Sequence, residues 1–190
     1  MSALFRPAIV LFLMMTLITG IAYPLVVTGI AHVAFPTQAA GSILMRNGTP
    51  VGSTLIGQSF SDPKHFWSRP SATSPQPYNG LASGGSNLGP LNPALTDGIK
   101  SRIDALHAVD PANKGAIPVD LVTASASGLD PDISLAAAYY QAPRVARERG
   151  LAPRSVETLI VTHARGRWLG ILGEPRVNVL ELNLALDAMK

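Results

Sequence analysis

The chain has 190 residues, of which 47% are hydrophobic and only 14% are charged. Soluble proteins average about 25% charged residues, so part of this chain avoids water. It contains no cysteine, which excludes disulfide frameworks, thiolate zinc sites and cysteine nucleophiles. Only Arg6 of the 15 Lys and Arg residues precedes residue 36, so the remainder is nearly balanced against the 12 acidic residues. That balance argues against nucleic-acid binding.

A long apolar segment lies near the N-terminus. Residues 7–45 contain no Asp, Glu, Lys or Arg, and residues 8–35 are almost continuously apolar. About 20 such residues span a bilayer, so we expect one transmembrane helix, kinked near Tyr23-Pro24. A cleaved signal peptide is the alternative, but its apolar core would have about 7 to 15 residues. The greater length of this segment favours an uncleaved anchor.

The charges beside this segment predict its orientation. Arg6 precedes it, whereas no basic residue follows it until Arg46. Because basic residues favour the cytoplasmic side, we expect a cytoplasmic N-terminus. Residues 1–35 are then the cytoplasmic tip and transmembrane helix, and residues 36–190 form one extracytoplasmic, periplasmic domain.

The outer domain begins with a hairpin signal and a long loop. Asn47-Gly48, between residues 42–46 and 49–54, is typical of a tight type I′ turn. Residues 58–92 are rich in Gly, Pro, Ser and Asn, which predicts a loop. Its interspersed aromatic residues favour an ordered loop.

Helix signals dominate the rest of the chain. One helix is predicted from an N-cap at Asn92 to about residue 107, and a second from near Ser134 to Gly150, with a kink at Pro143. A third should begin near Pro153 and end before residue 166. Residues 177–189 fit both periodicities, and their good helix formers favour a helix. The predicted fold class is α+β, with helix in excess and a small β-element.

The sequence offers few groups for catalysis. It has neither a phosphate-binding Gly-x-x-x-x-Gly-Lys-[Ser/Thr] loop nor a Gly-x-Ser-x-Gly nucleophile elbow, and its four histidines are widely separated. No catalytic residue and no metal site is predicted. Asp130 and Asp132 could form a cation site, but they better suit turn formation and helix capping. Gln141 and Arg144 could present donors to a ligand or partner, or could lie on a solvated helix face.

Distinctive residue runs occur along nearly the whole chain. They begin with Arg6-Pro7-Ala8, Thr19-Gly20 and Tyr23-Pro24, and the most specific run is residues 118–130. The others are Gly52-Ser53, residues 55–58, Phe60, Phe66, residues 69–72, Tyr78-Asn79, and residues 82–88, 141–146 and 177–187. In these runs the chain resembles the C subunits of the Kdp potassium-transporting ATPase, a bacterial high-affinity potassium uptake complex.

The resemblance implies a non-catalytic accessory subunit of the bacterial inner membrane. Its partners would be a channel-like potassium-binding A subunit, a P-type ATPase B subunit and the small F subunit. ATP and potassium would bind at the level of the complex, and this chain alone would bind no cofactor. The family is described as a catalytic chaperone that raises the ATP affinity of the B subunit. Its Gln-x-x-Arg motif corresponds to Gln141 and Arg144.

That role conflicts with the predicted orientation, because a periplasmic Gln141 lies across the bilayer from cytoplasmic ATP. The alternative is a periplasmic cap that shapes potassium entry to the channel-like subunit without nucleotide contact. Partner-binding candidates are small or kink-forming residues of the membrane helix and large residues of the long loop: Thr19, Gly20, Tyr23, Pro24, Phe66, Trp67, Arg69 and Tyr78. The loop residues could equally form a buried satellite core.

Overall fold

The structure is a computed structural model that describes residues 2–189. It separates into two compact units, one ending at Val51 and one beginning at Gly52. The fold is α+β with helix in excess, as predicted. The predicted division between residues 35 and 36 falls within the first unit, just after its long helix.

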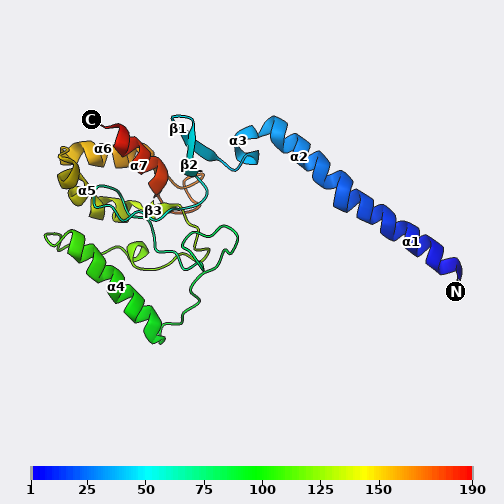
Figure 1. Ribbon diagram of the computed structural model, residues 1–190, viewed down its shortest axis with the longest axis horizontal. Coiled ribbons are helices and arrows are strands. Elements are labelled where there is room, and N and C mark those ends of the chain that lie inside the picture. The colour runs from blue at the N-terminus through cyan, green and yellow to red at the C-terminus, as the bar shows by residue number, and fades with distance from the viewer. Residues whose placement is uncertain (1, 190) are drawn as a thin grey trace. The chain divides into compact units, whose positions relative to one another are not determined.

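The first unit is dominated by one continuous helical segment (Figure 1). Helix α1 (Ser2–Leu17) passes through a π-helical turn, η1 (Ile18–Ala22), into α2 (Tyr23–Ala34). The helical segment Leu4–Ala34 is long and apolar enough to cross a membrane, judged by length and composition. The N–H of Tyr23 bonds to the carbonyl of Ile18, five residues back. Proline has no N–H and crowds the preceding turn, so Pro24 accounts for the irregularity at the place where the sequence predicted a kink.

A β-hairpin follows a single helical turn, α3 (Pro36–Ala39). Strands β1 (Ile43–Arg46) and β2 (Thr49–Ser53) pair with each other, and the turn Asn47-Gly48 joins them. Both turn residues have positive φ, 52° and 78°, which a type I′ turn requires. The predicted hairpin is confirmed.

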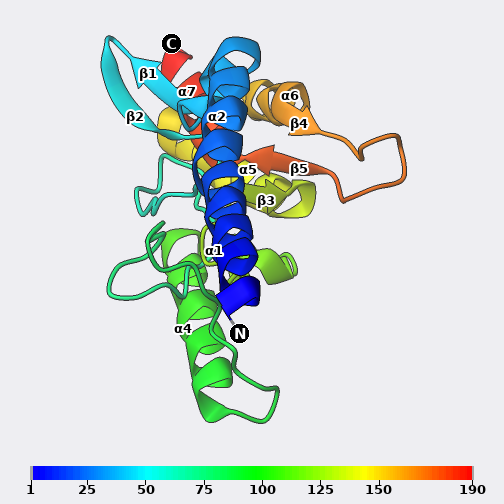
Figure 2. The ribbon, with the colours of Figure 1, turned by 90° about the vertical axis from the view of Figure 1, so that its right-hand side faces the viewer.

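The predicted loop is also confirmed, since residues 54–92 contain no helix or strand (Figure 2). Backbone hydrogen bonds fix it to a second irregular segment: Gly57 N donates to Leu129 O and Gly84 N donates to Ser127 O, both at 2.9 Å. A Cβ on the neighbouring Gly85 would lie 2.8 Å from Ala126 O. Glycine is therefore needed there, because the two backbones touch.

The three predicted helices form with the expected caps. Asn92 caps α4 (Pro93–Val109) by accepting from Ala94 N at 3.0 Å. Ser134 caps α5 (Leu135–Arg149) in the same way, and Gly150 ends it with φ +65°. Helix α6 (Pro153–His163) has proline at its first position. A short 3-10 turn, η2 (Val119–Leu121), precedes α5.

A small antiparallel sheet was not predicted. Its strand order is β3 (Asp132–Ser134), β5 (Arg176–Asn178) and β4 (Ala164–Arg165). Helix α7 (Val179–Ala188) follows β5 directly and is capped by Asn178. The last segment is thus a helix, as favoured, but it starts with a strand, which explains its mixed periodicity.

The hydrophobic core lies where α5, α6 and α7 pack on this sheet (Figure 1). Burying each large aliphatic side chain contributes about 1.5 to 3 kcal/mol. The fully or almost fully buried residues of the core are Phe66, Ile133, Ala137, Ala138, Val145, Val156, Ile160, Val177, Val179, Leu182 and Leu186. The core therefore also holds one residue of the long loop, Phe66.

Candidate functional site

The Gln-x-x-Arg motif lies on the inner face of α5. Gln141 is 1% exposed and Arg144 is 2% exposed, so the interpretation of a solvated helix face is wrong. Together with Asn183 of α7, they hold the backbone of residues 63–67 in the long loop. We call these three side chains the clamp.

Two carboxamides of the clamp bind adjacent residues in the same manner. Gln141 Oε1 accepts from Trp67 N at 2.7 Å, and Gln141 Nε2 donates to Trp67 O at 3.1 Å. Asn183 does the same for Phe66, with both distances at 2.9 Å. Each carboxamide satisfies one N–H and one C=O, as a neighbouring strand would. The loop is thereby fixed without forming a sheet.

Arg144 completes the clamp. Its Nη1 donates to Pro63 O and, at 3.1 Å, to His65 O, while Nη2 donates to Gln141 Oε1 at 2.8 Å. The guanidinium also lies 5.2 Å from the centre of the Trp67 ring, within cation–π range. Burial lowers the pKa of Arg144 to about 10, opposed in part by Asp110. Arg144 therefore stays protonated at neutral pH.

Further side-chain contacts hold residues 64 and 65 against α5 and α7. His65 Nε2 lies 2.9 Å from Asp187 Oδ1, which also accepts from Arg149 Nη2 at 2.6 Å. Arg149 Nε donates to Lys64 O at 2.7 Å. A backbone hydrogen bond from Lys64 lowers the pKa of Asp62. The segment is thus tied to both α5 and α7.

The structure brings together some of the predicted site residues and separates others. Gln141 contacts the Trp67 backbone, and Arg144 lies over the Trp67 ring. Phe66 lies wholly inside the core. The other candidates lie elsewhere. Arg69 pairs with Asp130 and Tyr78 donates its hydroxyl to Arg69 O, while Thr19, Gly20, Tyr23 and Pro24 belong to the first unit.

Sequence reasoning missed Asn183. A carboxamide among the leucines of residues 177–189 was the available signal, because a polar side chain on an apolar helix face needs a partner.

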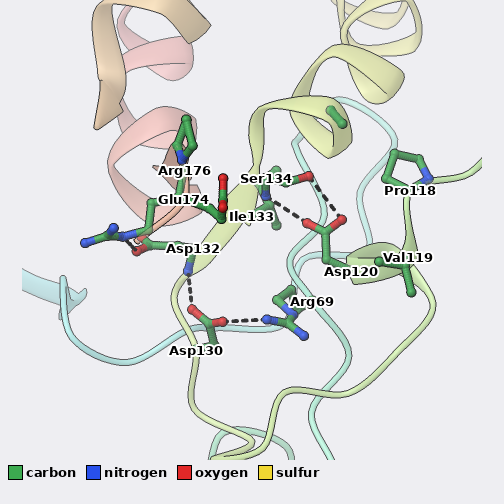
Figure 3. A pocket seen from close by; sticks show the side chains of 12 residues that line it. Arg69, Pro118, Val119, Asp120, Asp130, Asp132, Ile133, Ser134, Glu174 and Arg176 are labelled. Carbon is green, nitrogen blue, oxygen red and sulfur yellow. Dashed lines mark hydrogen bonds and ion pairs between the residues drawn. The ribbon is translucent and has the colours of Figure 1, made fainter. Parts of the chain in front are cut away.

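A cavity of about 460 Å³ lies beside the sheet, and its lining includes Asp120, Asp130 and Asp132 (Figure 3). Asp130 accepts from Arg69 Nη1 at 2.8 Å and from Asp132 N at 3.0 Å. Asp120 accepts from Ser134 N at 2.8 Å. Arg176 Nε donates to Asp132 Oδ2 at 2.7 Å, yet burial raises the pKa of Asp132. These bonds support the turn interpretation, and residues 2–189 contain no group of three or more metal-binding side chains.

The fold and the clamp define a class of protein. One N-terminal helix suits a membrane span, and it is joined to an α+β domain whose most buried polar side chains bind the domain's own backbone. These features fit a single-pass membrane protein with one folded domain beside its helix.

Comparison with known proteins gives the family. Residues 5–188 match the family described as KdpC, the K+-transporting ATPase c chain. A relative from Variovorax paradoxus (strain S110) is 67% identical over 188 residues, covering 99% of this chain and 97% of its own. One from Sorangium cellulosum (strain So ce56) is 60% identical over 190 residues, covering all of both chains. Both relatives are named potassium-transporting ATPase KdpC subunit. The chain belongs to the KdpC family.

Proposed function

We propose that the chain is a non-catalytic accessory subunit of a potassium-transporting ATPase, and that its outer domain acts on partner subunits without contacting ATP. The single observation that carries this proposal is the clamp. Gln141 and Arg144, the residues that the resemblance links to nucleotide, are buried and bind the backbone of residues 63–67. A nucleotide would have to displace those bonds, each worth about 1 kcal/mol or more.

The partners in this proposal are the channel-like A subunit, the P-type ATPase B subunit and the small F subunit. The chain stabilises their assembly through its membrane helix and its periplasmic domain, which caps the potassium entrance of the A subunit. Arg6 before the apolar helix supports this orientation. A catalytic-chaperone effect on the B subunit is then indirect, transmitted through assembly rather than through Gln141.

A matched pair of variants tests the absence of nucleotide contact. Gln141→Ala and Asn183→Ala each remove one carboxamide from the clamp, but only Gln141 belongs to the Gln-x-x-Arg motif. The measurement is ATPase rate against ATP concentration in the purified complex, corrected for the amount of complex assembled. We expect both variants to reduce assembly and to leave the KM for ATP unchanged. A raised KM for ATP in Gln141→Ala alone would contradict the proposal.

A further inference from the structure

A second cavity, of about 250 Å³, lies between the long loop and α4. Its lining includes two arginines, Arg69 and Arg102, together with Ser59, Phe60 and Tyr78, and none of its lining residues is acidic. It thus differs from the cavity beside the sheet, where carboxylates predominate. Asp130 balances one of these two arginines, so the pair adds a net positive charge beside the cavity, which favours an anion.

Arg102 is the less compensated of the two cations. It is half-buried on α4, and its Nη1 donates to Val122 O at 2.7 Å. Burial alone lowers the pKa of Arg102, with no contribution from a nearby carboxylate. Within the part of the chain whose side chains are described, we find no ion pair of Arg102. A half-buried guanidinium without an ion pair can take an anion as its counter-charge.

Arg69 is only partly satisfied. Its Nη1 donates to Asp130 Oδ2 at 2.8 Å, on the side of the other cavity. Its Nε is buried and has no acceptor among the described residues. Buried donors are almost always paired, so Arg69, which lines the cavity, has a hydrogen-bonding capacity that the described part of the protein does not fill. The pairing with Asp130 fixes the orientation of the planar guanidinium, which suits recognition of an oxyanion.

We propose that this cavity binds one oxyanion group, a carboxylate or a phosphate, between Arg69 and Arg102. Ser59, exposed at the cavity wall, supplies a hydroxyl donor. The group can belong to a free small anion or to an acidic side chain of a partner subunit, and the chemistry of recognition is the same. Binding to the isolated chain does not depend on the function proposed above, so the two can fail separately.

The test titrates inorganic phosphate into the purified full chain in detergent micelles, followed by calorimetry. Saturable binding with one site per chain is expected. Ser59→Asp places a carboxylate inside the cavity without removing a buried group, so it should weaken phosphate binding by about tenfold or more. Ser61→Asp adds the same charge at an exposed position outside the lining and should leave binding unchanged. Absence of saturable binding, or equal weakening by both variants, would overturn the proposal.

In a second pair of variants, each substitution removes one positive charge. Arg102→Gln should weaken phosphate binding by about tenfold or more, the loss expected for a charge-assisted hydrogen bond. Arg154→Gln removes an exposed arginine of α6 and should have no effect. Thermal unfolding without phosphate verifies that both variants are folded, and unchanged binding by folded Arg102→Gln refutes the site.

The same titration on the assembled complex identifies the natural source. Phosphate binding that persists indicates a free anion, whereas binding lost on assembly indicates that a partner's carboxylate fills the cavity. Either result supports the site, provided that the isolated chain binds phosphate as described.

Discussion

Replacing Gln141 with alanine should destabilise the second unit, which begins at Gly52, by about 3 kcal/mol. The substitution removes the partner of Trp67 N, of Trp67 O and of Arg144 Nη2. An unsatisfied buried polar group costs about 1 to 3 kcal/mol. We take the low end for each group because Trp67 is only half-buried, so water can reach part of its backbone. Three groups at about 1 kcal/mol each give the total.

The assay is chemical denaturation of the full chain in micelles, followed by tryptophan fluorescence. Trp168 is 67% exposed, so a Trp168→Phe background leaves Trp67 as the reporter beside the clamp. Gln76→Ala serves as the control, because Gln76 is exposed and, among the described residues, only its backbone carbonyl is bonded. An unfolding free energy within about 0.5 kcal/mol of the parent, the range of neutral surface changes, would refute the structural role of Gln141.

Three further predictions concern backbone packing, buried charge and the exposed turn. Gly57→Ala should destabilise by about 1 to 3 kcal/mol in denaturation experiments, because its Cβ would lie 2.7 Å from Asp130 O. Gly98 lies in α4 with open space around it, so Gly98→Ala should stabilise the chain by about 0.5 to 1 kcal/mol. Stabilisation by Gly57→Ala, or destabilisation by Gly98→Ala, would contradict the packing described. Because burial raises the pKa of Asp132, its native carboxyl holds a proton more readily than the unfolded one. The Asp132 carboxyl therefore makes its full contribution to the free energy of unfolding below the ordinary pKa of aspartate. That contribution is lost as the pH rises through the raised pKa of the native state. Asp132→Asn should flatten that part of the pH dependence of unfolding, and an unchanged profile would count against this assignment. Leu169→Ser, at a 71% exposed position between β4 and β5, should change stability by less than about 0.5 kcal/mol, and a larger loss would show that the residue is packed.

The helices could be predicted because their ends have local causes. Asn92 and Ser134 cap their own helices, and Gly150 supplies the left-handed residue that ends α5. The Asn47-Gly48 turn is equally local. Such signals involve residues two to four positions apart, so one sequence is enough to find them.

The sheet and both sites depend on distant residues. Strands β3 and β5 have three residues each and β4 has two, too short for alternation to be recognised. Gln141 is a candidate both from its spacing to Arg144 and from the family motif, but its partner Trp67 lies 74 residues away in sequence. Arg102 gave no signal, because a lone arginine on a helix resembles a solvated one until the loop is folded over it.

The side of the membrane on which the α+β domain lies tests the central claim most directly. The chain has no cysteine, so single cysteines can be placed at Ser101, which is exposed on α4, and at Ser2. Both variants are treated with a membrane-impermeant maleimide in intact spheroplasts and again after permeabilisation. Ser101→Cys should react in intact spheroplasts, whereas Ser2→Cys should react only after permeabilisation. The reverse pattern would place the domain beside cytoplasmic ATP and contradict the account.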